Sequence, residues 1–314
     1  MPFLAPIIGA IGGAITSAAT ALGFGAAAAG AISSAVVQFG VSFLVNTAFS
    51  AIFAKKPKVQ DVARDLAQPT TSPAYRFPYG ECRATGTPVG TPVKGKKIYG
   101  AWLLSSRPSD LSTFTLYLDK REVVLTGDAF DLDGPGATAT EDPFSGHVTV
   151  WVSRGDHTAP PTEFTDDAAY VEGSADHLWK TTDAWKGRTM IWLKLDAGDS
   201  GKRQERWPST PPLVEVEGRW SLVEDPRTGI TAWSDNHALC VRDALMNNPI
   251  RGYRAEQLHS SFDEDGPNAC DEVVTLNSGG SEKRYICGGT LVFNEGEIED
   301  QLNPMMISGA ADFI

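Results

Sequence analysis

The amino-acid sequence predicts a mainly β protein in which a β-rich domain is followed by an α+β domain and preceded by an apolar helical segment. Short runs rich in β-branched and aromatic residues recur between residues 76 and 223, and few gaps between them could hold a crossover helix. Helical periodicity becomes clear only after Asp235. We therefore expect an antiparallel β-barrel or sandwich over residues 76–223 and an α+β domain over residues 224–314.

The distribution of charged residues indicates a boundary between residues 1–54 and the rest of the chain. Residues 1–54 contain no charged side chain, so residues 55–314 carry all 27 Lys and Arg and all 39 Asp and Glu. Residues 55–75 include the prolines Pro69 and Pro73, which favour extended backbone before them, and this segment is predicted to be a linker.

Residues 1–54 are predicted to form a hydrophobic helical hairpin that turns at Gly23–Gly25. Each arm has about the 20 residues that a helix needs to span a bilayer core. Small residues recur at every fourth position from Gly9 to Ala21, which permits close helix packing, whereas Gln38 and Asn46 are costly in lipid. Packing inside an oligomer or a tube, contact with a membrane, and a cleaved signal peptide remain open. The signal peptide is disfavoured because no basic residue precedes the apolar stretch.

Six runs in the β-rich region predict strands because they combine β-branched and aromatic residues and most are bounded by turn residues. They are Lys97–Leu104, Thr113–Leu118, Glu122–Leu125, His147–Val152, Thr189–Leu195 and Leu213–Trp220. Two loops interrupt them: Asp131–Gly136 is predicted to be a turn, and Ser153–Trp185 a long excursion over the surface. The tryptophans lie mostly among acidic and apolar residues and are expected to be core or contact residues.

The C-terminal region has mixed signals. Asp235–Met246 places apolar residues on one helical face and is expected to end at Asn248-Pro249. Glu282–Phe293 is predicted to form a strand pair or a bent strand. Asn294 is a possible cap for a last helix, which Pro304 is expected to end or kink just after Leu302.

Two patterns suggest catalysis, and we predict that neither supports it. Gly90–Lys96 fits the spacing GxxxxGK, but Lys97 stands where a phosphate loop needs Ser or Thr, and a strand follows instead of a helix. The pairs Asp156-His157 and Asp176-His177 have no placed nucleophile and are predicted to be solvated loop residues. We therefore expect no catalytic and no cofactor-binding residue, and a protein that is not an enzyme.

No metal site is predicted either. Asp128, Asp131 and Asp133 resemble a calcium loop only loosely, since Gly134 is out of register and no Glu closes the loop. The four cysteines form no CxxC pair and have no His at ligand spacing, which argues against zinc. Cys82, Cys240, Cys270 and Cys287 are expected to be buried free thiols.

The charge balance excludes proteins whose main affinity is for a phosphate backbone. The net charge is −12, and residues 233–314 alone hold fourteen Asp and Glu against five Lys and Arg, a net of −9. Strong backbone binding requires clustered basic residues. This chain is therefore not expected to bind nucleic acid tightly.

Six short segments in sequence order resemble the hub region of phage tail-tip proteins, the central-fibre or host-specificity family of lambda-like siphophages and gene transfer agents. The likeness is clearest from Trp220 onward and looser from Pro73 to Trp220. The segments are a DPRTG loop, a WxDNxA helix start, a DxL helix, an NPxxG turn, an ACDE helix end and an ExRYxCxG strand, found at Asp225–Gly229, Trp233–Ala238, Asp243–Leu245, Asn248–Gly252, Ala269–Glu272 and Glu282–Gly289.

The resemblance implies a homotrimeric hub at the tail tip of the virion, assembled in the host cytoplasm, with β-barrel domains like those of the tail tube. It implies contacts with the distal tail protein, the tape measure protein and other tip or fibre proteins, and passage of phage DNA through the lumen without specific binding. Residues 1–54 would plug the tube and could contact the host membrane. Family members usually extend further, so host recognition is expected from another protein or a further part of the chain. The alternative is a membrane-anchored bacterial β-rich protein with residues 1–54 as its anchor.

Overall fold

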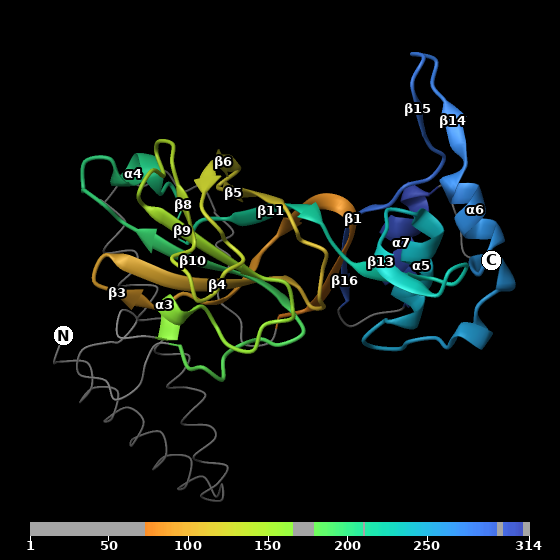
Figure 1. The fold of residues 1–314 in the computed structure, drawn as a ribbon, viewed down its shortest axis with the longest axis horizontal. Coiled ribbons are helices and arrows are strands. Elements are labelled where there is room, and N and C mark those ends of the chain that lie inside the picture. The colour runs from red at the N-terminus through yellow and green to blue at the C-terminus, as the bar shows by residue number, and fades with distance from the viewer. Residues whose placement is uncertain (1–72, 166–178, 210, 294–297, 310–314) are drawn as a thin grey trace, which may run out of the picture.

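The structure is a computed structural model that describes residues 73–165, 179–209, 211–293 and 298–309, and it is mainly β with antiparallel sheets (Figure 1). The predicted helical hairpin of residues 1–54 and nearly all of the predicted linker lie outside the described residues. Within the described ranges, no helix has both the length and the apolar character needed to cross a bilayer.

Two large antiparallel sheets and two hairpins contain all the described strands. The first sheet has the order β16 (Gly288–Phe293), β1 (Tyr75–Thr85), β11 (Val214–Arg219), β5 (Phe114–Leu118) and β6 (Arg121–Val123). The second has the order β2 (Thr87–Gly90), β4 (Lys97–Ser105), β10 (Thr189–Asp196), β9 (Val148–Ser153), β8 (Ala137–Ala139) and β7 (Leu125–Thr126), with β3 (Val93–Lys94) also paired to β4. The hairpins are β12 (Leu222–Asp225) with β13 (Ile230–Trp233), and β14 (Val273–Thr275) with β15 (Ser281–Lys283).

The described helices are short, and most of them lie in the C-terminal part of the chain. They are α3 (Thr162–Thr165), α4 (Arg203–Arg206), α5 (His237–Met246), α6 (Asp265–Asp271) and α7 (Ile298–Ser308), with the 3₁₀ turns η2 (Ala255–Gln257) and η3 (Ser260–Phe262). We call residues 81–220 the β lobe. Residues 221–309 together with the first half of β1 are the C-terminal lobe.

The two large sheets share one apolar core, to which both contribute buried side chains such as Trp102, Leu116, Ile191 and Val216. Neither sheet closes on itself within the described residues, so of the two expected architectures the layered one forms and the barrel does not. Each sheet ends on one side in a very short strand, since β6 has three residues and β7 has two. A closed barrel requires the first and last strands to pair along their length.

The position of β10 in its sheet explains why its residues are apolar at consecutive positions and do not alternate with polar ones. It lies between β4 and β9, and successive side chains point to opposite faces. Ile191 and Leu193 enter the core between the sheets, whereas Met190 and Trp192 enter a second core on the outer face of the same sheet. The part of a strand that is buried on both faces is therefore a nearly continuous apolar run.

The segment Ser153–Trp185, which was expected to run over the surface, is anchored by buried aromatic residues in the part that the structure describes. Phe164 of α3 is fully buried at the centre of the outer core, with its ring 5.4 Å from Trp192, 5.5 Å from Tyr99 and 5.6 Å from Trp151. Trp179 closes the same cluster and donates its indole N–H to the carbonyl of Tyr99 at 2.8 Å. The outer face of the sheet is apolar, and this segment covers it.

Strand β1 belongs to both lobes (Figure 1). Residues Tyr75–Gly80 pair with β16, and residues Glu81–Thr85 pair with β11. The change of partner occurs at Gly80, which has φ +60° and whose added Cβ would lie 1.7 Å from the carbonyl oxygen of Cys287. Only glycine combines this backbone conformation with so close an approach.

We expect Gly80→Ala to lower the free energy of unfolding by more than about 2 kcal/mol. The left-handed backbone costs about 1–2 kcal/mol for a residue with a Cβ, and relief of the clash requires backbone movement that adds to this cost. Gly95→Ala is the matched control, because Gly95 also has φ +60° but has nothing within 4 Å of the added Cβ. Equal losses for the two variants in denaturant unfolding would contradict the close approach at Gly80.

Most other predicted elements are confirmed. All six predicted runs contain strands whose ends lie within a few residues of the expected ones, although Glu122–Leu125 is divided between β6 and β7. The predicted helix corresponds to α5 and ends before Asn248. The prediction for Glu282–Phe293 is wrong, because its two halves do not pair with each other or form one strand: β15 pairs with β14, and β16 pairs with β1.

Pro304 does not end the last helix, since α7 continues past it to Ser308. Leu302 and Met305 are buried on one side of α7, and this packing holds the helix. Pro304 and Asp300 are exposed, so water can satisfy the carbonyl that loses its helical partner. The possible cap Asn294 lies outside the described residues.

Candidate functional site

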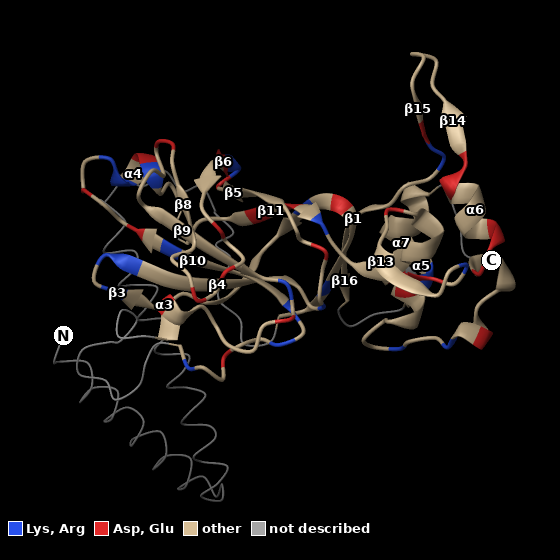
Figure 2. Ribbon diagram, viewed as in Figure 1, with Lys and Arg blue, Asp and Glu red and all other residues tan. Residues whose placement is uncertain are grey.

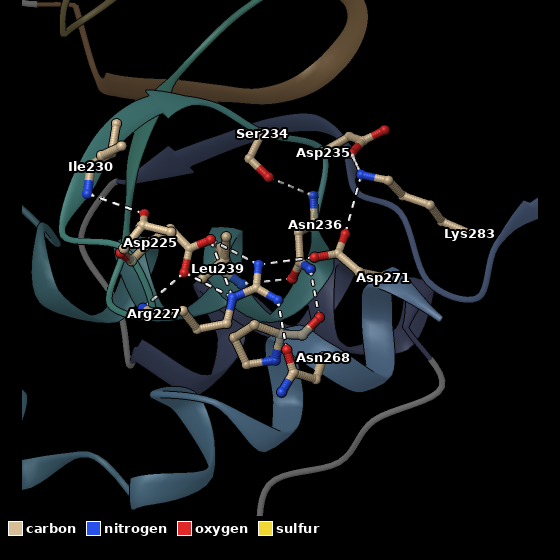
Figure 3. Close-up of polar contacts among 12 residues, drawn as sticks. Asp225, Arg227, Ile230, Ser234, Asp235, Asn236, Leu239, Asn268, Asp271 and Lys283 are labelled. Carbon is tan, nitrogen blue, oxygen red and sulfur yellow. Dashed lines mark hydrogen bonds and ion pairs between the residues drawn. The ribbon is translucent and has the colours of Figure 1, made fainter. Parts of the chain in front are cut away.

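Residues from four of the six segments meet in one polar network in the C-terminal lobe (Figure 3). Its centre is Arg227, in the turn between β12 and β13. The side chain of Asp225 accepts hydrogen bonds from the backbone N–H of Arg227 at 3.0 Å and from its Nε at 2.9 Å, which fixes the turn. Arg227 Nη2 then donates to Asp271 at 2.9 Å, and its Nη1 donates to Asn268 at 2.9 Å. The DPRTG loop is thereby joined to the end of α6.

Asn236 and Lys283 extend this network to two more of the segments, the helix start at Trp233–Ala238 and the strand at Glu282–Gly289. Lys283 Nζ contacts Asp235 at 2.8 Å and Asp271 at 3.2 Å, which ties β15 to both the start of α5 and the end of α6 (Figure 3). Asn236 caps α5 by accepting the N–H of Leu239, and its side-chain amide donates to the carbonyl of Pro267 at 2.9 Å. We call these residues the Arg227 network: Asp225, Arg227, Asp235, Asn236, Asn268, Asp271 and Lys283.

The electrostatics of the Arg227 network favour ionised partners. Hydrogen bonds from Arg227 hold the pKa of Asp225 below its usual range. Burial alone would raise the pKa of Asp271, but hydrogen bonds from Arg227, Asn236 and Lys283 outweigh it, so that this pKa is lowered as well. Every nitrogen of the Arg227 guanidinium donates to a protein acceptor. The arrangement is therefore suited to clamping four segments together, and it leaves little donor capacity for a ligand.

The lowered carboxyl pKa values predict a loss of stability in acid. A carboxyl whose pKa is lower in the folded state stabilises the fold above its unfolded pKa of about 3.9, and this contribution is lost as the pH falls through the folded value. The free energy of unfolding should fall between about pH 5 and pH 2, and we expect Asp271→Asn to make this fall smaller by up to about 1 kcal/mol, since the site is partly screened by solvent. Thermal unfolding at several pH values measures the difference between the variant and the wild type. Asp199→Asn removes an exposed carboxylate outside the network and is the matched control for the loss of one negative charge.

A second network joins the two lobes. Arg107, which follows β4, forms an ion pair with Asp243 of α5 through Nη1, and its Nη2 donates to Asp243 at 3.1 Å and to the carbonyl of Leu222 at 2.6 Å. The hydroxyl of Tyr79 donates to the same carboxylate at 2.7 Å, and Asn247 donates to it at 2.9 Å. Burial, with the charge of Asp243, raises the pKa of Tyr79, which therefore stays protonated.

The residues considered for catalysis remain separate in the structure. His157 is half-buried and its Nε2 contacts the carbonyl of Ala184, while Asp156 is exposed beside Arg154. Burial lowers the pKa of His157. Residues 90–96 run from the end of β2 into the turn between β3 and β4, and no helix follows them. The pair Asp176-His177 lies outside the described residues.

The residues considered for metal binding are used by local structure. Asp128 accepts the N–H of Phe130, Asp131 accepts the N–H of Asp133 and of Gly134, and Asp133 accepts the hydroxyl of Thr162. No group of three or more potential ligands is found in the part of the chain that the structure describes. The cysteines are free, as expected, with Cys240, Cys270 and Cys287 buried and Cys82 half-buried.

Sequence reasoning found the segments that build the Arg227 network but did not predict their contacts, and it missed the network of Arg107, Asp243 and Tyr79. No sequence signal connects Arg107 with Asp243, because they are 136 residues apart and neither lies in a charge pattern. Comparison with known proteins adds no family: no protein-family model matches the chain, and no curated protein matches it.

Proposed function

We propose that this chain is a structural virion protein, the hub at the tail tip of a long-tailed bacteriophage, and not an enzyme. The observation that carries the proposal is the resemblance of six segments, in order, to the hub family. The Arg227 network supports it, because residues from four of these segments meet in one clamp. Such convergence explains why these short segments would recur together in a structural module without catalytic residues.

In this role three copies surround the tail axis, and tail-tube-like β domains continue the tube. The hub closes the tube, connects it to the distal tail protein, the tape measure protein and fibre or tip proteins, and opens for DNA ejection. The acidic C-terminal lobe fits passage without binding, because like charge keeps a phosphate backbone from adhering. Figure 2 shows acidic residues on α6 and at the base of the β14–β15 hairpin. Residues 1–54 would plug the tube and contact the host membrane during ejection.

Purified particles test this function. We expect the chain to co-purify with virions and, in a reconstruction of the intact tail tip, to occupy three positions around one axis. A different number of copies, or a position away from the axis, would refute the hub assignment. The alternative, a bacterial protein anchored by residues 1–54, is motivated by the length of the uncharged span. It predicts that the chain sediments with membranes in uninfected cells and is absent from particles.

The role of residues 1–54 has its own test. A peptide of these residues should permeabilise liposomes if they meet a membrane during ejection. A peptide that neither inserts nor permeabilises would remove the membrane step and leave the packing role. The position of the hub in the particle is unaffected by this result.

A further inference from the structure

Residues 249–286 form an excursion from the C-terminal lobe that is held by few apolar contacts. They include η2, η3, α6 and the β14–β15 hairpin, which projects away from the rest of the lobe (Figure 1). Only Pro267 and Cys270 are buried along this stretch. A segment with so few buried side chains opens at a lower free energy than the core from which it extends.

Two thiols lie where the excursion leaves and rejoins the core. Cys240 in α5 precedes it and is fully buried, and Cys287, immediately before β16, follows it and is 6% exposed. Both contact the same backbone segment: the sulfur of Cys240 is 3.6 Å from the carbonyl oxygen of Ser234, and the N–H of Cys287 donates to the carbonyl of Asp235 at 2.7 Å. The backbones of Asn236 and Ile286 form a β-bridge beside them.

Both cysteines also belong to the same buried apolar cluster of the C-terminal lobe. A hydrogen bond with Cys287, together with burial, raises the pKa of Cys240 well above its usual value. The half-buried thiol of Cys82 interacts with Cys287 through charge alone, which raises the pKa of Cys82 slightly beyond the effect of burial, and no other thiol contributes to the raised pKa of Cys270. Cys240 and Cys287 are therefore the pair that the fold brings together.

We propose that Cys240 and Cys287 form an intramolecular disulfide when the protein meets a low-molecular-weight disulfide such as oxidised glutathione. The thiolate of Cys287, the less buried of the two, attacks one glutathione sulfur and releases one glutathione thiolate. The thiolate of Cys240 then attacks the mixed disulfide at Cys287 and releases the second. Two protein thiols lose their protons and two electrons, and one oxidised glutathione becomes two reduced glutathiones.

The disulfide would close the excursion at its base. A cross-link that closes a long loop stabilises the folded state mainly by restricting the unfolded chain. The reaction is slow at neutral pH because little thiolate is present, and it becomes faster as the pH rises. Reducing cytosol keeps such thiols free, whereas an oxidising exterior favours the bond. The inference depends only on the position of the two thiols and holds whether or not the chain is a tail-tip hub.

The experiment uses the folded full-length chain, reduced and then incubated at about pH 8.5 with oxidised glutathione to favour the thiolate. We expect a loss of the mass of two hydrogens, a cross-linked peptide pair containing Cys240 and Cys287, and a melting temperature higher by roughly 5–10 °C that reductant reverses. Cys270→Ser is the matched control, since it removes another buried thiol and should leave the cross-link intact. Cys240→Ser, with its fold checked by circular dichroism, should stop the reaction at a glutathione adduct on Cys287.

Three results would overturn the proposal. They are a cross-link between a different pair of cysteines, glutathione adducts without a cross-link in the wild-type chain, and four free thiols in the folded chain under conditions that oxidise the chain in denaturant. The denatured sample shows that the oxidant is active, so unreacted thiols in the folded chain count against the pair.

Discussion

Arg107→Met should lower the free energy of unfolding by about 3–5 kcal/mol, because it leaves the carboxylate of Asp243 buried without its cationic partner. Asp243 is 6% exposed, and the remaining donors, Tyr79 and Asn247, are neutral. Equilibrium unfolding in urea measures the loss. The wild-type contacts lie between the lobes, so the variant should also show whether the lobes still unfold in one transition.

Two further variants separate the buried charge from a general effect of removing an arginine. Arg284→Met removes an exposed pair with Glu272, 2.8 Å apart, and should lower the free energy of unfolding far less, because water screens an exposed ion pair. Arg107→Met combined with Asp243→Leu removes both charges and should recover much of the stability lost in the single variant. If Arg107→Met lowered the free energy of unfolding as little as Arg284→Met does, the interpretation of a buried ion pair between the lobes would be wrong.

Phe164→Ala should also lower the free energy of unfolding by about 3–5 kcal/mol. The substitution removes a fully buried aromatic ring and leaves a cavity among Tyr99, Trp151 and Trp192. The ring is also the main anchor of the covering segment that contains α3. We therefore expect red-shifted tryptophan fluorescence and faster proteolysis between Ser153 and Trp185. Both changes would follow from exposure of the outer core.

Tyr75→Ala is the control for Phe164→Ala, because Tyr75 is 46% exposed at the start of β1 and should cost about 1 kcal/mol or less. Phe164→Leu keeps most of the apolar volume and should lose less than the alanine variant. Unchanged fluorescence and unchanged protease resistance in Phe164→Ala would show that the segment covers the sheet without depending on this ring.

The sequence allowed the strands of the β lobe to be predicted because their apolar and β-branched runs are local signals. It gave no such signal for β1, which contains Pro78 and Gly80 and so resembles a turn. The pairing of β1 with β16 was also beyond prediction, since about 200 residues separate Pro78 from Thr290 and strand partners so distant leave no local pattern.

The candidate site shows the same division between local and distant information. The turn at Asp225–Gly229 and the cap at Asn236 are local features that the residue types specify. The contact of Arg227 with Asp271 depends on how α6 packs, and the contact of Arg107 with Asp243 depends on how the two lobes meet. Long charged side chains reach partners that only the complete fold brings near.

The sharing of β1 between the lobes also determines how the protein bears mechanical load. A force that separates the lobes along the axis of β1 acts parallel to the strand and across its ladders with β16 and β11. Ladder hydrogen bonds lie perpendicular to the strand, so they are sheared together rather than broken one after another. Rupture then requires most bonds of one ladder to fail at once. The junction between the lobes is therefore a stiff connection under tension along this axis.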